Sequence, residues 1–276
     1  MTTLTAGPAD EAYELLAPHF RGYARSRAAY LDAVDRIGAR RSPAHARALL
    51  DVGAGDGARA TALARACLLS TVVLAEPSPA LAARCREQPL AEVWRVRAEE
   101  LPAPSRRFDV VTCLWNVLGH VPTREARKTA LARMRALLAP DGVMFLDVNN
   151  RYNARAYGLP RTLARWLFDR VRPCESHGDV VVTWLLGEKT VRLRGHVFTP
   201  REAESLFAEA GLAVLRRFVV DYETGERRRF ACEGQLLYEL AIPRASRGRA
   251  FFASRRSPSG ASKRIFTILS AARPSP

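Results

Sequence analysis

Several features are scarce in this chain of 276 residues, and each absence narrows what the chain can be. Its five cysteines are scattered and no two form a CxxC pair, so we expect neither a disulfide framework nor a metal site. No apolar run approaches the roughly 18 residues that a membrane span needs. The start, MTTLTAGPADEAYELL, has acidic residues and no apolar signal region. We therefore expect a cytoplasmic protein with no membrane partner.

Lysine is also rare, because only three of the 43 basic residues are lysines. The formal net charge of +15 suggests a nucleic-acid partner. However, residues 241–276 hold eight Lys and Arg and no Asp or Glu, and subtracting them leaves +7 on the rest. We expect residues 244–276 to form a flexible basic tail, with RNA contact as the alternative.

Alternating strand and helix patterns predict an α/β fold with a parallel sheet in residues 1–243. Residues 1–45 are expected to form a helical cover, with two helices broken near Pro18. An insert at residues 151–197, which contains a hairpin turning at GEKT, interrupts the alternation after the fifth strand. The last two strands could run antiparallel. The seven expected strands are residues 48–52, 71–76, 91–98, 108–115, 142–148, 212–220 and 234–242.

The stretch ALLDVGAGDGARA, residues 48–60, predicts a buried strand that breaks into a turn with three glycines. Ala58 and Arg59 stand where a P-loop requires Lys and Ser or Thr, which excludes a P-loop. The turn satisfies GxGxG and also the GxGxxA of dinucleotide folds, so the glycines alone leave both kinds of nucleoside ligand open. Glu76, 21 positions after Gly55, ends the next strand, where a carboxylate accepts from ribose hydroxyls.

Asp51 distinguishes between these ligands. It lies inside the strand, two residues before Gly53. A carboxylate there is unfavourable for an anionic pyrophosphate, whereas it suits a ligand that carries an ammonium and a sulfonium. The sequence therefore favours S-adenosylmethionine over a dinucleotide.

The chain from about Tyr13 to Ile242 resembles the class I S-adenosylmethionine-dependent methyltransferases of the small-molecule type. LLDVGAGDG looks like their first motif and VVLAEPSPALAARCRE like their second. AEELPAPSRRFDVVTCLWNVLGHV is similar to their third region and fourth strand, and LLAPDGVMFLDVNN to their fifth-strand motif. AYELLAPHF is similar to their N-terminal cover helix. The resemblance implies a Rossmann-like seven-stranded sheet flanked by helices, with residues 151–197 as an acceptor lid.

The resemblance also implies a set of residues that bind S-adenosylmethionine. Members often place an Asp against the adenine, but Arg97 stands there, and an arginine cannot accept that hydrogen bond. The backbone of Ala98 or the carboxylate of Glu99 is expected to take its place. The expected cofactor-binding residues are Tyr13, Asp51, Gly53, Ala54, Gly55, Glu76, Pro77, Ala98, Glu99, Leu114, Trp115 and Asn116.

Methyl transfer from a sulfonium is an in-line displacement, so the enzyme mainly aligns its reactants, and a general base matters for a hydroxyl acceptor. His120, in NVLGHV, follows the fourth strand near where the methyl group should point, and His196 ends the hairpin; both are catalytic candidates, although a structural or surface role is open for each. Asn149, Asn150 and Tyr152 follow the fifth strand and are candidates to orient the acceptor, with a turn as the alternative role of the asparagines.

These residues lead to the hypothesis of a methyltransferase that modifies an oxygen or nitrogen of a small molecule, such as one in natural-product biosynthesis. An RNA-modifying methyltransferase that uses the basic tail, a nucleoside-binding regulator without catalysis, and a dinucleotide oxidoreductase are the alternatives. The acceptor and the oligomeric state are left open by the sequence.

Overall fold

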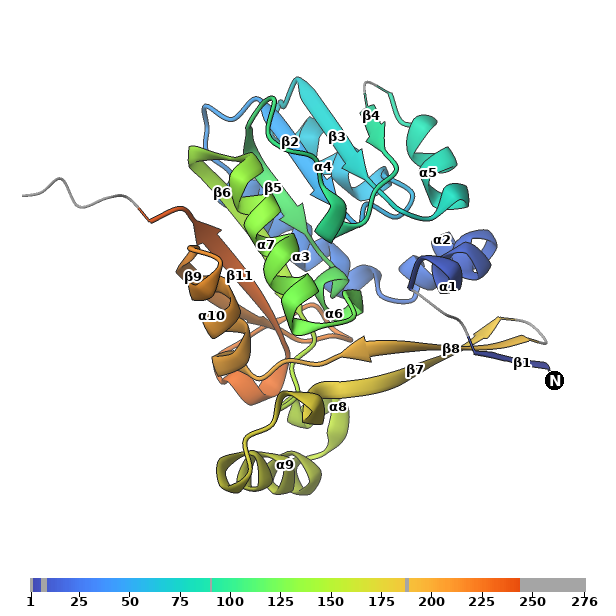
Figure 1. Cartoon of the computed structure of the whole chain (residues 1–276), viewed down its shortest axis with the longest axis vertical. Coiled ribbons are helices and arrows are strands. Elements are labelled where there is room, and N and C mark those ends of the chain that lie inside the picture. Colours follow the sequence, from blue (N-terminus) through green and yellow to red (C-terminus); the bar gives the residue numbers. More distant parts are fainter. Residues whose placement is uncertain (1, 6–8, 90, 187–188, 244–276) are drawn as a thin grey trace, which may run out of the picture. The chain divides into compact units, whose positions relative to one another are not determined.

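The computed structural model of the chain describes residues 2–5, 9–89, 91–186 and 189–243 (Figure 1). They fall in one compact unit, Met1–Arg244. The predicted basic tail, residues 244–276, lies outside the described residues, and so do two residues of the GEKT turn.

A sheet of eight strands in the order β10-β9-β11-β6-β5-β2-β3-β4 forms the centre of this unit (Figure 1). Five neighbours, from β6 to β4, run parallel. Strand β11 runs antiparallel to both β6 and β9. The seven predicted strands and the antiparallel end of the sheet are confirmed, and the two-residue β10 adds an eighth. The strands are β2 (Ala48–Val52), β3 (Thr71–Ala75), β4 (Ala91–Trp94), β5 (Phe108–Cys113), β6 (Leu138–Val148), β9 (Ala213–Val220), β10 (Arg227–Arg228) and β11 (Gln235–Ala241).

Helices cover both faces of the sheet (Figure 1). Their starts follow local chemistry, since Ser78, Thr123 and Thr199 each accept a backbone N–H as N-caps. The helices are α1 (Ala9–Leu16), α2 (Phe20–Arg25), α3 (Ala28–Arg41), α4 (Ala58–Ala66), α5 (Pro79–Arg86), α6 (Val117–His120), α7 (Arg124–Leu137), α8 (Ala154–Tyr157), α9 (Leu159–Val171) and α10 (Pro200–Glu209). Short 3₁₀ turns lie at Ala17–His19, Ala98–Glu100, Glu175–Gly178 and Ala231–Glu233.

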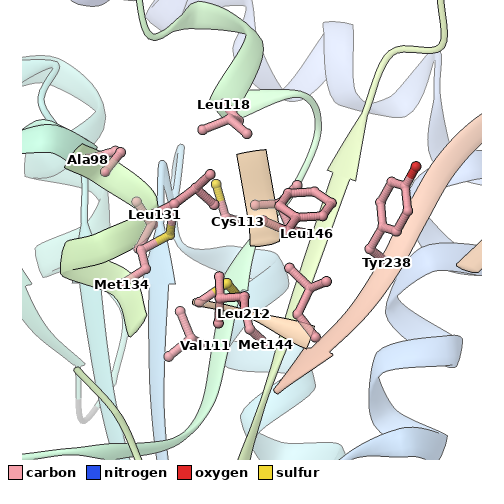
Figure 2. Close-up of a cluster of buried hydrophobic side chains, with 14 of the residues drawn as sticks. Ala98, Val111, Cys113, Leu118, Leu131, Met134, Met144, Leu146, Leu212 and Tyr238 are labelled. Atoms are coloured by element: carbon pink, nitrogen blue, oxygen red, sulfur yellow. The ribbon is translucent and has the colours of Figure 1, made fainter. Parts of the chain in front are cut away.

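The sheet is buried on both faces because successive residues point to opposite sides. On one face, Val111, Cys113, Met144 and Leu146 pack with Met134 of α7 (Figure 2). On the other face, the neighbouring positions pack against α3 and α4. This double burial fixes the strand register and brings the carboxyl ends of β2, β3 and β5 to one edge of the sheet.

The insert forms a second, three-stranded sheet with the N-terminus. Strands β7 (Asp179–Leu186) and β8 (Lys189–His196) make the predicted hairpin. Strand β1 (Thr2–Thr5) pairs in parallel with β8, so the first residues of the expected helical cover are a strand. The helical part of the cover also differs, because α1, α2 and α3 replace the two expected helices, with Pro18 inside the first break. Hairpin residues and N-terminal helix residues share one hydrophobic cluster.

Candidate active site

A cavity of about 1040 Å³ lies at the carboxyl ends of β2, β3 and β5. The N-terminal helices contribute Tyr13, Phe20 and Arg21 to its wall, and the hairpin contributes Asp179 and Arg194. Most of the expected cofactor-binding residues line it: Tyr13, Asp51, Gly53, Ala54, Gly55, Glu76, Pro77, Ala98, Glu99, Leu114 and Trp115. The cavity is therefore bounded by the sheet edge, the N-terminal helices and the insert.

The glycine turn after β2 has a backbone that other residues rarely adopt. Gly53, Gly55 and Gly57 have φ values of 73°, 61° and 74°. A Cβ atom on Gly53 would lie 2.4 Å from Val117 Cγ2, and one on Gly55 would lie 2.4 Å from the Phe20 ring. The turn thus needs glycine both for its conformation and for the close approach of two side chains of the cavity wall.

Asp51 places a buried carboxylate in the cavity, with 8% of the residue exposed. Thr112 Oγ1 donates a hydrogen bond of 2.6 Å to Asp51 Oδ1. Burial raises the pKa of Asp51 to about 6, and the Thr112 hydrogen bond opposes that rise. The side chain is therefore ionised at neutral pH and provides a negative charge for a cationic ligand group.

Glu76 connects the turns that follow β2 and β3. Its Oε2 accepts from the backbone N–H of Gly55 at 2.8 Å, and its Oε1 accepts from that of Ser78 at 3.0 Å. The residue is only 4% exposed. These two bonds fix the Glu76 carboxylate at the point where both turns meet, and the residue lines the cavity.

Aromatic side chains form another part of the wall. Tyr23 stacks on Trp115 with ring centroids 5.2 Å apart, and Trp115 Nε1 donates to the Tyr222 hydroxyl at 3.0 Å. Trp115 has a left-handed backbone, φ 69°, which is unusual for a bulky residue. Buried Asp147 holds this loop by accepting the backbone N–H of Asn116 and the hydroxyl of Tyr30.

The sequence analysis missed Tyr23, Thr112, Asp147 and Tyr222. Tyr23 could have been found, because it follows Phe20 at helical spacing within the cover helices. Thr112 lies opposite Asp51 only through strand pairing. That pairing leaves no local sequence pattern.

His120 lies at the end of α6 and lines the cavity. Its ring meets Tyr13 edge-on, with centroids 5.5 Å apart. Burial lowers the pKa of His120 to about 4, although a hydrogen bond with the backbone of Arg194 opposes the shift. Nδ1 is buried and has no hydrogen-bond partner in the part of the chain that the structure describes. His120 is therefore a neutral imidazole with one unsatisfied nitrogen.

His196, the second catalytic candidate, is not among the residues that line the cavity. Its Nδ1 lies 2.7 Å from Asp179 Oδ1 and its Nε2 lies 2.6 Å from Glu202 Oε1. The residue is 1% exposed and its ring packs edge-on against Phe198. Both ring nitrogens are engaged, so the arrangement is that of a structural histidine.

The other predicted residues outside the cavity wall are Asn116 and the three acceptor-orienting candidates. Asn116 Oδ1 accepts the backbone N–H of Asn149, and its Nδ2 donates to the His196 carbonyl. Buried Asn150 donates to two backbone carbonyls, while the Tyr152 hydroxyl donates to Asp169. A parallel bridge between Asn150 and Phe198 directs this segment away from the cavity, so these side chains hold loops together.

The described ranges also bear on other kinds of site. No three His, Cys, Asp or Glu side chains there gather as metal ligands do. No helix in those ranges has the length and apolar character that a membrane crossing requires.

Comparison with known proteins identifies the family. The model of the methyltransferase domain family matches residues 20–217, well over half of the chain. The chain belongs to this family. The sheet places an antiparallel strand between β6 and β9, and the cavity lies at the turn after β2. Both features are those of a class I S-adenosylmethionine-dependent methyltransferase domain.

Individual relatives agree with this class. The chain is 33% identical over 137 residues to the ubiquinone biosynthesis O-methyltransferase of Haemophilus ducreyi. This alignment covers 47% of this chain and 56% of the relative. The chain is 34% identical over 119 residues to the ubiquinone biosynthesis O-methyltransferase of Actinobacillus pleuropneumoniae, covering 40% of this chain and 49% of the relative. The chain thus spans about half the length of these curated relatives.

Solved structures show the same fold. The CcbJ methyltransferase of Streptomyces caelestis has a TM-score of 0.57 and 17% identity, covering 76% of this chain and 89% of that chain. The amino pentose methyltransferase CalS10 of Micromonospora echinaspora has a TM-score of 0.55 and 22% identity. The match covers 82% of this chain and 95% of that chain.

The residues present fit S-adenosylmethionine. The buried carboxylates of Asp51 and Glu76 and the glycine turn between them face the same cavity. Arg59, a cation near Asp51, is bound to Asp35 by two hydrogen bonds, which makes it a poor partner for a pyrophosphate. The donor set therefore favours a ligand with positive groups and hydroxyls.

Proposed function

We propose that this domain methylates an oxygen or a nitrogen of a small-molecule acceptor bound inside the cavity. The observation that carries the proposal is that one cavity joins Asp51 and Glu76 to His120, whose Nδ1 has no partner among the described residues. Its volume of about 1040 Å³ lies at the upper end of the roughly 300–1,000 Å³ typical of small-molecule sites. Such a volume has room for a cofactor and a small acceptor together.

Specific residues would hold the cofactor. Asp51 would accept from its amine, Glu76 would accept from its ribose hydroxyls, and the turn at Gly53 and Gly55 would allow close approach of backbone. Ala98 and Glu99 would meet the edge of the adenine. When bound, S-adenosylmethionine supplies a methyl group made electrophilic by the adjoining sulfonium.

His120 would take the proton from the acceptor. Because its ring hydrogen-bonds to the Arg194 backbone and no described residue partners Nδ1, a neutral imidazole that donates to that carbonyl has its lone pair on Nδ1. Nδ1 is buried in this conformation, so the ring must turn toward the cavity for Nδ1 to reach an acceptor. A positioned general base typically contributes about 10²- to 10⁴-fold to transfer from a hydroxyl, and the low pKa of His120 makes the lower end of that range the expected contribution. A neutral amine acceptor needs this help much less.

Support for an oxygen acceptor comes from the two curated relatives, which are named O-methyltransferases. The aromatic side chains of Tyr13, Phe20 and Trp115 in the cavity wall favour an acceptor with an apolar or planar part. Arg194 and Asp179 of the hairpin give the wall two charged residues that could select for polar substituents.

The test is transfer of a labelled methyl group by the full chain to a panel of catechols, phenols, amino sugars and bulk RNA. We expect label in one of the small-molecule classes. Label in RNA alone, or no transfer to any acceptor although S-adenosylhomocysteine binds, would overturn the proposal. The first result would support the RNA-modifying alternative and the second would support a non-catalytic regulator.

A further inference from the structure

Helix α9, Leu159–Val171, is exposed along nearly all of its length although it is rich in large apolar side chains. Leu159, Leu163, Leu167 and Val171 are 68%, 52%, 51% and 79% exposed. Their spacing of four residues places them in one row along the helix. Phe168, 49% exposed, widens this apolar row. Thr162 is the one buried residue of this fully described helix.

The opposite side of α9 is fixed to the protein. Asp169 forms a salt bridge with Arg151 at 2.7 Å and also accepts from the Tyr152 hydroxyl. His177 Nδ1 lies 2.9 Å from the same carboxylate. Figure 1 shows α9 away from the central sheet, and no α9 residue lines the cavity. The helix is thus held in place with its apolar row facing outward, and the active site does not explain that row.

Arginines border the apolar row. At 100° per residue, Arg170 falls between Leu159 and Leu163 around the helix, and Arg161 falls just beyond Phe168. Arg172 directly follows the last helical residue, Val171. Residues 153–172 contain five arginines and one acidic residue, Asp169, which is already bound. Arg170 packs over the Trp166 ring at 4.8 Å, so its aliphatic stem lies along the apolar surface.

This charge pattern selects among possible partners. Two copies of α9 packed face to face would bring arginines together without acidic counterparts. Residues 244–276 of the same chain carry eight Lys and Arg and no Asp or Glu, so they are equally unsuited. A helix with an apolar face and arginine flanks matches the boundary between phosphate headgroups and acyl chains.

We infer that α9 binds the surface of a membrane that contains anionic lipid. Its apolar row enters the acyl boundary, while Arg161, Arg170 and Arg172 meet the phosphates. The helix lies on the surface and does not span the bilayer. This inference revises the sequence-based expectation of no membrane partner, which rested on the absence of a membrane span.

The test is flotation of the full chain with vesicles of phosphatidylglycerol and phosphatidylcholine in equal parts. The double variant Leu163→Gln/Leu167→Gln should lower the vesicle partition coefficient by about tenfold or more. Each of Arg161→Gln and Arg172→Gln should lower it about fivefold. The matched control is Leu68→Gln/Leu215→Gln, which removes leucines that are 80% and 54% exposed on other elements and should leave the coefficient unchanged.

Several outcomes would overturn the inference. If the parent chain and the α9 double variant had equal vesicle partition coefficients, any binding would belong to another segment, such as the basic tail. Equal binding to pure phosphatidylcholine vesicles would remove the role of the arginines. Failure to bind either vesicle, with a concentration-dependent dimer that the double variant abolishes, would show that α9 covers a second copy of the chain. Retained affinity for S-adenosylhomocysteine would show that the variants are folded.

Discussion

Thr112 and Asp51 face each other across the pairing of β5 and β2, and the Thr112 hydroxyl donates to the Asp51 carboxylate over 2.6 Å. Burial raises the pKa of Asp51 to about 6. Holding an ionised carboxylate here at neutral pH destabilises the folded protein, because the unfolded chain would solvate it. A site that keeps an anion under these conditions is built for a cationic ligand.

Replacing this carboxylate with its neutral isostere should separate stability from binding. Asp51→Asn should raise the free energy of unfolding at pH 7 by roughly 1–3 kcal/mol, since a buried charge is removed and Thr112 can still donate. Affinity for S-adenosylhomocysteine should fall about tenfold or more, because the ligand amine loses its counter-charge. Urea unfolding and calorimetry measure the two effects.

Asp109→Asn is the matched control. Asp109 accepts the backbone N–H groups of Arg47 and Ala48 at the opposite edge of the sheet. This variant should lose stability and keep its ligand affinity. A stabilised Asp109→Asn together with an unchanged affinity of Asp51→Asn would contradict the assignment of the site.

The stability gain of Asp51→Asn should depend on pH. Because the folded pKa is about 6, above the ordinary value of 3.8, Asp51 favours folding below about pH 4, and this contribution is lost as pH rises through 6. The difference in unfolding free energy between Asp51→Asn and the parent should therefore grow between about pH 4 and pH 7. Urea unfolding at a series of pH values tests this, and a difference independent of pH would refute it.

Glu76→Ala should weaken both the fold and the ligand site. The substitution leaves the N–H groups of Gly55 and Ser78 without their acceptor, which should lower the free energy of unfolding by about 2–4 kcal/mol. Affinity for S-adenosylhomocysteine should fall about tenfold or more. Glu14→Ala is the control, since Glu14 accepts from Ser78 Oγ and Ala80 N but does not line the cavity. If Glu76→Ala and Glu14→Ala lost the same affinity for S-adenosylhomocysteine, the loss would reflect disorder of the loop and not a direct contact between Glu76 and the ligand.

His120→Phe should affect catalysis and leave cofactor binding intact. Phenylalanine keeps an aromatic ring against Tyr13 but has no nitrogen to accept a proton. With a hydroxyl acceptor, kcat should fall about 10²-fold or more while affinity for S-adenosylhomocysteine stays within about twofold. In the parent enzyme the His120 pKa of about 4 predicts that this base stays active from about pH 5 upward. Unchanged kcat would show that His120 is structural.

His196→Ala should have the opposite pattern. It removes the partner of Glu202 and of Asp179 and leaves a cavity beside Phe198. We expect the free energy of unfolding to fall by roughly 2–4 kcal/mol, with kcat nearly unchanged below the unfolding transition. A large loss of kcat in a stably folded variant would restore the catalytic role.

The sequence was informative where the structure depends on local patterns. Buried strands such as residues 142–148 of β6 are rich in apolar residues, and capped helices such as Pro200–Glu209 follow a cap at Thr199, so their positions could be predicted. The first residues of β6, 138–141, were expected to end the preceding helix. Asp51 and Glu76 could be identified as site candidates because each lies at a fixed offset from the end of such a strand. Both line the cavity.

The parts that could not be predicted depend on contacts between distant segments. The pairing of Thr2–Thr5 with β8 leaves no mark in either stretch. A lone histidine in a sequence does not reveal which way it faces, so His120 and His196 appeared equivalent until the hairpin placed His196 between two carboxylates. Asn149 and Asn150 follow a strand end as acceptor-binding residues would, but neither lines the cavity, and the Asn150 side chain donates to two backbone carbonyls.

The most direct test of the central claim, that the glycine turn with Asp51 and Glu76 is a site for S-adenosylmethionine, is a calorimetric titration of the full chain. S-adenosylhomocysteine and NADH would be added separately, and then NADH would be added in competition. The account predicts saturable binding of one S-adenosylhomocysteine per chain and no displacement by NADH. Tight NADH binding, or displacement of S-adenosylhomocysteine by NADH, would contradict it.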